Sequence, residues 1–176
     1  MEFTKETAKK LLEEHVKDDY QKLHASMVAT ALEAYAKKLG EDENLWYITG
    51  LLHDLDYFKY PDEHPSESLK WFKEWGFPLE LITAVAEHAF DRTRVEIQTK
   101  LGAALTACDE MSGFLYAYSL MRPEGFEGME ASSVKKKFKD KAFARKVSRE
   151  DINIGIEKFG VDFKEHVSFL VEVFKK

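Results

Sequence analysis

The sequence predicts an all-α protein built as one helical bundle. Apolar residues recur at intervals of three and four over nearly all of the 176 residues, which is the spacing of amphipathic helices. No segment alternates apolar and polar residues as a half-buried strand would. No internal repeat or low-complexity linker divides the chain, so we expect residues 1–176 to form a single domain.

Apolar spacing and helix-breaking residues set the expected order of elements. Gly40 ends the second helix and Gly76 the fourth, while the proline-bearing "YPDEHPSES" and the polar "DRTR" are expected breaks. The hydroxyl of Ser148 is a candidate cap for the helix that follows it, with Asp151 three residues on. The expected helices lie around residues 11–15, 20–38, 44–54, 68–75, 78–90, 95–121 and 132–138, then one after Ser148 and one from Asp162 onward.

Composition and charge exclude several classes of function. No apolar run approaches the roughly 20 residues that cross a bilayer, and the N-terminal residues lack the pattern of a signal peptide. The single cysteine, Cys108, permits no internal disulfide, so we expect a cytoplasmic protein without a membrane partner. The net charge of -6 argues against binding of a nucleic-acid polymer. A small anionic substrate remains open, because a bound metal could supply the positive charge it needs.

Polar side chains occupy positions where the helical pattern expects burial. His24 shares a face with Val28 and Ala31, and Asp109 lies in an apolar stripe with Leu105. Burying such groups without partners is costly, and imidazoles together with carboxylates suit Zn, Fe or Mn. The competing interpretation is that each is an ordinary hydrogen-bonded core residue. It requires every one of these buried polar groups to find its own partners independently. Six residues on inward faces or adjoining loops form the candidate ligand set: His24, His53, Asp54, His64, His88 and Asp109.

Four of these residues carry a resemblance to a known family. His24 in "KLHASMVA", His53 and Asp54 in "GLLHDLD" and Asp109 in "ACDEMSG" make residues 20–118 resemble the HD superfamily of metal-dependent phosphohydrolases. His64 in "EHPSES" and His88 in "VAEHAF" look like the two further histidines of members that hold two metals. The resemblance implies an HD-domain helical bundle with appended C-terminal helices over residues 119–176. It also implies one or two divalent transition-metal ions, such as Fe, Mn, Zn, Ni or Co.

The same resemblance implies a reaction. We expect a metal-dependent phosphohydrolase acting on a small phosphate ester, a nucleotide or nucleotide-like metabolite, through a metal-activated water. His53 and Asp54 are the expected catalytic residues: Asp54 bridges two metals, with His24, His53 and Asp109 on one and His64 and His88 on the other. HD-type mixed-valent diiron oxygenases, which act on a polyol or phosphonate, share this ligand order and are the alternative. A binding module with a vestigial site is disfavoured, because no ligand is missing.

Cationic side chains near the ligand set are candidates for substrate binding. Arg92 and Arg94 follow His88 and could face phosphate oxygens, although they are equally expected as solvated loop charges. Lys59 is a weaker match, because Asp56 intervenes in "HDLDYFK". The basic run from Lys135 to Lys146 is expected to be an exposed helix face. Three neighbours of Asp109 complete the expectations: Glu110 and Ser112 as partners that orient ligands, and Cys108 as core packing.

Overall fold

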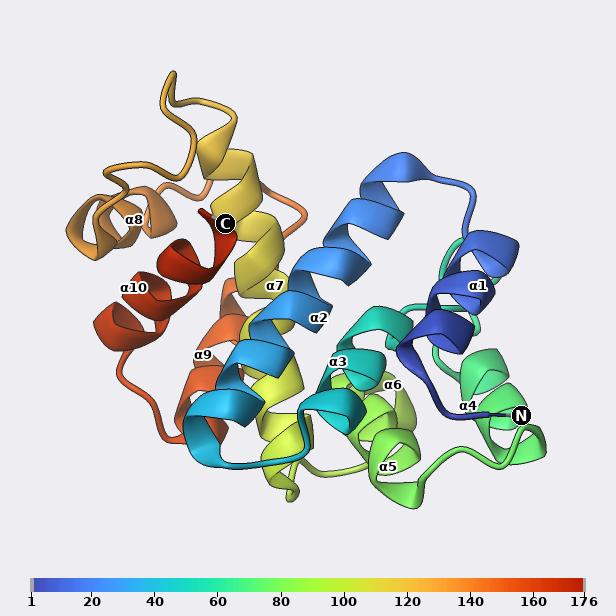
Figure 1. Ribbon diagram of the computed structural model, residues 1–176. Helices are drawn as coiled ribbons and strands as arrows, with labels where there is room; N and C mark the ends of the chain where they lie inside the picture. The colour runs from blue at the N-terminus through green and yellow to red at the C-terminus, as the bar shows by residue number, and fades with distance from the viewer. Residues whose placement is uncertain (1, 176) are drawn as a thin grey trace.

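The computed structural model describes residues 2–175, in which ten helices are joined by turns and no strand occurs (Figure 1). This confirms the all-α prediction. Within the described residues, no helix combines the length and the apolar character needed to cross a membrane. The helices are α1 (Lys5–His15), α2 (Asp19–Leu39), α3 (Glu43–Leu52), α4 (Ser66–Glu74), α5 (Leu79–His88), α6 (Phe90–Thr93), α7 (Lys100–Ser119), α8 (Ala131–Phe138), α9 (Arg149–Phe159) and α10 (Phe163–Phe174).

Side-chain caps explain where several helices begin. Ser148 accepts a hydrogen bond from Asp151 N at its hydroxyl, as predicted, and starts α9. Asp162 caps α10 by accepting from the backbone of Lys164 and Glu165. Gly40 ends α2 with φ of 73°, in the left-handed region that a residue with a Cβ atom rarely adopts.

Two helix boundaries differ from the prediction. The helix expected through Asp54 ends at Leu52, and His53 caps it before a series of tight turns. The helix expected from Val95 starts at Lys100. Its start is fixed by the buried carboxylate of Glu87, which accepts hydrogen bonds from Gln98 N and Thr99 N, both at 3.0 Å. These bonds hold the preceding residues extended, so α7 cannot begin earlier.

The short polar segments also differ in detail. Part of the expected break "DRTR" belongs to the single-turn helix α6. The basic run expected as one exposed helix face is helical only as far as Phe138, because residues 139–147 form turns. The exposed lysines of that run carry no apolar stripe to hold a helix, so local contacts decide its path.

Helix α2 runs diagonally through the molecule (Figure 1). Its buried residues belong to two hydrophobic clusters. Its residues Ala25 and Ala29 pack with α1, α3, α4 and α5 on one side. On the other side, Val28 and Leu32 pack with α7, α9 and α10. Helices α3 and α7 both pack against α2, so the residues that follow α3 and those in the middle of α7 lie near the same helix.

The C-terminal helices share the second of these clusters. Ile152 of α9 and Leu170 of α10 are fully buried with Leu105 and Phe114 of α7. Cys108 is also buried in this cluster, in agreement with its expected packing role. That residues 1–176 form one domain, with an HD-type core at about 20–118 and a C-terminal helical extension at 119–176, stays a prediction.

Candidate metal centre

Five segments bring the predicted ligand set together. His24 comes from α2, His53 and Asp54 from the turn after α3, and the others from the turn before α4, the end of α5 and the middle of α7. Gly50 permits this convergence, because a Cβ atom there would lie 2.7 Å from Ala29 Cα and force α2 and α3 apart. The six side chains form two triads: His24, His53 and Asp109, and then Asp54, His64 and His88.

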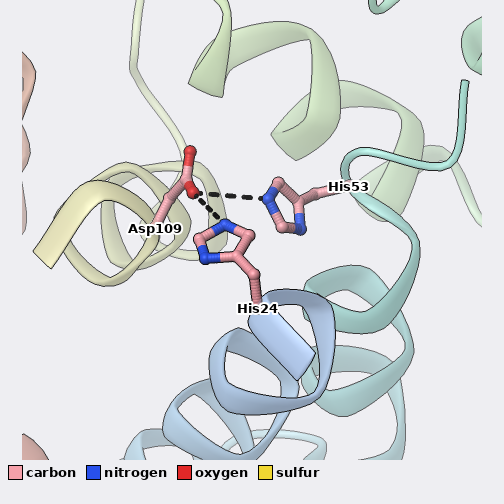
Figure 2. Close-up of side chains that lie close together, drawn as sticks. All are labelled: His24, His53 and Asp109. Atoms are coloured by element: carbon pink, nitrogen blue, oxygen red, sulfur yellow. Dashed lines mark hydrogen bonds and ion pairs between the residues drawn. The ribbon is translucent and has the colours of Figure 1, made fainter. Parts of the chain in front are cut away.

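In the first triad, both histidines face one oxygen of Asp109. Figure 2 shows Asp109 on α7 opposite the rings of His24 and His53. The oxygen Asp109 Oδ1 lies 2.8 Å from His24 Nε2 and 3.4 Å from His53 Nε2. Three potential ligand atoms therefore surround a single point.

In the second triad, two histidine nitrogens face each other and one carboxylate. His64 Nε2 lies 3.3 Å from His88 Nε2, and both lie near Asp54 Oδ1, at 3.3 and 3.7 Å. The other oxygen of Asp54 points to the first triad, since Oδ2 is 3.5 Å from His53 Nε2. Asp54 thus offers one oxygen to each triad.

The opposite ring nitrogens of three histidines are held by acceptors. Nδ1 of His53 donates to Gly50 O at 2.8 Å, and Nδ1 of His88 donates to Val85 O at 2.5 Å. Nδ1 of His64 donates to Asp56 Oδ1 at 2.7 Å. Each bond fixes the tautomer that leaves Nε2 free as a ligand, the usual support of a metal-binding histidine. The arrangement orients three rings toward the two triads.

The geometry fits divalent metal ions in two respects. Ligands at about 2.0–2.2 Å from a tetrahedral metal are about 3.3–3.6 Å apart. Four spacings within the triads, at 3.3, 3.3, 3.4 and 3.7 Å, are close to this range, and the hydrogen-bonded pair His24 and Asp109 is closer, at 2.8 Å. The second respect is the state of His53 Nε2, which is fully buried and has no hydrogen-bond partner among residues 2–175. The facing lone pairs of His64 and His88 are likewise repulsive without a cation between them. A metal in each triad would satisfy these atoms.

Charge couples the histidines to the aspartates. Burial by itself lowers the pKa of His53, but the charges of Asp54 and Asp109 outweigh it and raise the pKa to about 10. Burial raises the pKa of both carboxyl groups, yet the charge of His53 brings the pKa of Asp54 and of Asp109 below the usual range. The two carboxylates therefore favour positive charge at the histidines, which a divalent ion can supply.

The centre is open to solvent on one side. The side chain of Asp54 is 30% exposed and that of Asp109 is 20% exposed, whereas His53 is fully buried. Two exposed tyrosines flank the triads: Tyr20 stacks on His24 with ring centroids 6.4 Å apart, and Tyr57 meets His64 edge-on at 5.5 Å. Aromatic faces beside a metal centre can stack on a planar substrate group.

The three predicted substrate-binding cations have other contacts among the described residues. Nη1 of Arg92 donates to Pro61 O at 2.7 Å and to His64 O at 3.1 Å, so it holds the turn that carries His64. Lys59 is exposed near His15, where burial and then the charge of Lys59 lower the pKa of the imidazole. Arg94 lines a hollow with Ile154 of α9. Among the described residues, none of the three hydrogen-bonds to a side chain of the triads.

The expected orienting partners also have other contacts. Ser112 donates to Cys108 O at 2.6 Å, and the carboxylate of Glu110 accepts from Ser148 N at 3.1 Å. Burial, and then the charge of Asp109, raise the pKa of Glu110 to about 8. Glu110 therefore connects α7 to the start of α9 rather than orienting a ligand through a hydrogen bond.

Asp56 is the supporting residue that the sequence analysis missed. It is fully buried, and besides His64 it accepts hydrogen bonds from Glu67 N and Ser68 N at 3.1 and 3.0 Å. It therefore joins His64 to the first turn of α4, which lacks a side-chain cap of its own. The available signal was a second aspartate two positions after the doublet, inside a segment that reads as buried.

An all-α bundle that gathers four histidines and two aspartates into adjacent triads defines a metal-binding helical protein. Comparison with protein families agrees, since the HD domain matches residues 23–113, and the chain belongs to the HD domain family. HD domains bind divalent metals, and the family includes metal-dependent phosphohydrolases. Comparisons with curated proteins and with solved structures gave no match.

Proposed function

We propose that the protein is a metal-dependent phosphohydrolase acting on a small phosphate ester, a nucleotide or nucleotide-like metabolite. The observation that carries the proposal is the position of Asp54, which offers one oxygen to each triad. One ion would be held by His24, His53 and Asp109 and another by His64 and His88, with an oxygen of Asp54 available to each. Metal ions held in this way polarise phosphoryl oxygens and activate water.

The roles of the surrounding residues follow from their contacts. Asp56, Gly50 O and Val85 O keep histidine protons on Nδ1, so that Nε2 stays available to a metal. Arg92 keeps the His64 turn in place while its remaining donors stay available for phosphate oxygens. The faces of Tyr20 and Tyr57 support a planar group such as a nucleobase. Lys59 and Arg94 stay predictions as substrate-binding residues.

The proposal includes a cellular location. Cys108, the single cysteine, is buried as a free thiol, which suits the reducing cytoplasm.

A reconstitution experiment tests this function. The metal-free protein would be loaded separately with Mn, Fe, Zn, Ni or Co and assayed for phosphate release from a panel of nucleotides and phosphate esters. We expect metal-dependent turnover that is lost in Asp54→Ala and kept in the matched control Asp62→Ala, an exposed aspartate of a neighbouring turn. Oxygen consumption by the iron-loaded protein with a polyol or phosphonate, without phosphate release, would instead support the diiron oxygenase and contradict the proposal.

A further inference from the structure

The turns that replace the expected basic helix form a positively charged hollow. Its volume is about 510 Å³, in the range of small-molecule sites. Six residues line this cationic hollow: Phe138, Lys139, Lys141, Arg145, Val147 and Arg149. Four cations around one hollow stand out in a chain whose net charge is -6.

Arg149 organises the turn that forms the hollow. Its guanidinium donates to the backbone carbonyls of Phe143 and Ala144, both at 2.6 Å, and to those of Val147 and Asp140 at 2.9 and 3.4 Å. These bonds hold Ala144 at φ of 44°, a conformation that is strained for a residue with a Cβ atom. The turn is therefore wrapped around one cation, which fixes the backbone from which Lys141 and Arg145 extend.

The four cations of the hollow form no ion pair with a carboxylate among the described residues. These cations are Lys139, Lys141, Arg145 and Arg149. Arg149 is partly buried between the rings of Phe114 and Phe138, and its Nε is buried without a hydrogen-bond partner. The charge of Arg149 therefore has no carboxylate to balance it and favours an anion in the hollow, while the exposed Lys141 and Arg145 supply the donors that such an anion would contact.

One lining residue of the cationic hollow, Val147, lies near His24, a residue of the first triad. Val147 Cγ2 and His24 Nδ1 lie 3.9 and 4.0 Å from one point, the position that a Cβ atom on Gly113 would occupy. Ser148, between two lining residues, donates its backbone N–H to Glu110, the neighbour of Asp109. One side chain, Val147, therefore borders both the hollow and the surroundings of His24.

We propose that the cationic hollow binds a second phosphate group of the substrate while the scissile phosphate lies at the metal centre. This inference rests on the proposed function and narrows the substrate to esters with at least two phosphates. Because Val147 lies between the cationic hollow and His24, the two phosphates of the substrate would be several bonds apart. They could be two groups of a polyphosphate chain, or two phosphates on opposite sides of a sugar. Lysine and arginine head groups are the side chains that bind phosphate oxygens at such sites.

Binding of inorganic pyrophosphate to the metal-free protein tests the hollow separately from catalysis. The double variant Lys141→Glu, Arg145→Glu reverses two lining charges, and Lys135→Glu, Lys136→Glu makes the same charge change on α8 outside the lining residues. We expect titration calorimetry to show binding that weakens by about tenfold or more in the first variant and little in the second. No binding, or equal weakening in both variants, would overturn the hollow as a phosphate site. Unchanged melting temperatures would verify that both variants fold.

A kinetic comparison tests the link to the substrate. In the metal-loaded protein, the double variant Lys141→Glu, Arg145→Glu should have a KM for adenosine triphosphate that is about tenfold or more above that of the wild type. Its KM for p-nitrophenyl phosphate, which has one phosphate, should stay within about twofold of the wild-type value. Equal changes for both probes would overturn the assignment of the second phosphate. Turnover of no phosphate ester by the wild type would count against the proposed function, and the pyrophosphate titration would still decide the hollow.

Discussion

Asp56→Asn tests whether a buried carboxylate positions His64. Asp56 accepts three hydrogen bonds, from His64 Nδ1 and from the backbone of Glu67 and Ser68. Asparagine has a similar shape but keeps only one oxygen. Its amide nitrogen would face either the two backbone N–H groups, which then lose their acceptor, or His64 Nδ1, which can accept from it only after the imidazole proton moves to Nε2, the ligand nitrogen.

The size of the effect follows from these contacts. A hydrogen bond to a charged group contributes about 1.5–3 kcal/mol, and an unsatisfied buried donor costs about 1–3 kcal/mol. Since Asn keeps part of the network, we expect the free energy of unfolding to fall by about 2–4 kcal/mol. Loss of a partner behind a metal-binding histidine typically weakens metal affinity by about 10–100-fold, and we expect that range here.

Two assays measure these effects. Urea unfolding of the metal-free protein gives the stability change, and titration of Mn or Zn into the same protein gives the affinity change. Asp62→Asn makes the same substitution at an exposed position and should change neither quantity. If Asp56→Asn unfolds at the wild-type urea concentration and binds metal as tightly, the positioning role of Asp56 is wrong.

Three further predictions concern packing, pH and metal. Gly50→Ala should destabilise the fold by about 1–3 kcal/mol, because its methyl group would meet the backbone of Ala29. In the matched control Gly113→Ala, the nearest atom to the new methyl group is 3.7 Å away. Equal urea midpoints for the Gly50→Ala and Gly113→Ala variants would contradict the close packing of α2 and α3. Burial lowers the pKa of His166 from 6.5 to about 4, so the unfolded chain takes up the proton first as pH falls. The contribution of neutral His166 to the free energy of unfolding is fully present above pH 6.5. Urea unfolding at a series of pH values should show that this free energy falls by about 3 kcal/mol as the pH is lowered to 4. A His166→Gln variant with the same pH dependence would refute this contribution. A chelator should lower the melting temperature of the wild type much more than that of an Asp54→Asn, Asp109→Asn double variant, and equal shifts in calorimetry would mean that the ions bind elsewhere.

Ligand residues that lie within regular helices were predictable from the apolar periodicity of the sequence. His24, His88 and Asp109 lie on faces that apolar neighbours turn inward, so the structure brings them together as the spacing predicts. Gly50 was recognisable as a point of close approach, because a missing side chain in a buried helix leaves room for a neighbouring backbone.

Contacts between turns were not predictable in the same way. Asp56 and Glu87 are buried by hydrogen bonds to backbone groups about eleven residues further along the chain, and no periodic pattern marks such partners. The turn around Arg149 has the same origin, since a basic exposed run contains no apolar stripe that fixes its conformation. Sequence reasoning located the helices that carry the centre but missed the loop contacts that hold the ligands in place.

Metal content tests the central claim most directly. Elemental analysis would be carried out on the wild type, Asp54→Ala, His64→Ala and the control Asp62→Ala after loading with Mn or Zn and removal of free metal. We expect about two ions per chain in the wild type and the control, about one in His64→Ala, and almost none in Asp54→Ala, because a bridging carboxylate serves both ions. Retention of about two ions by Asp54→Ala would contradict the dinuclear centre proposed for the two triads.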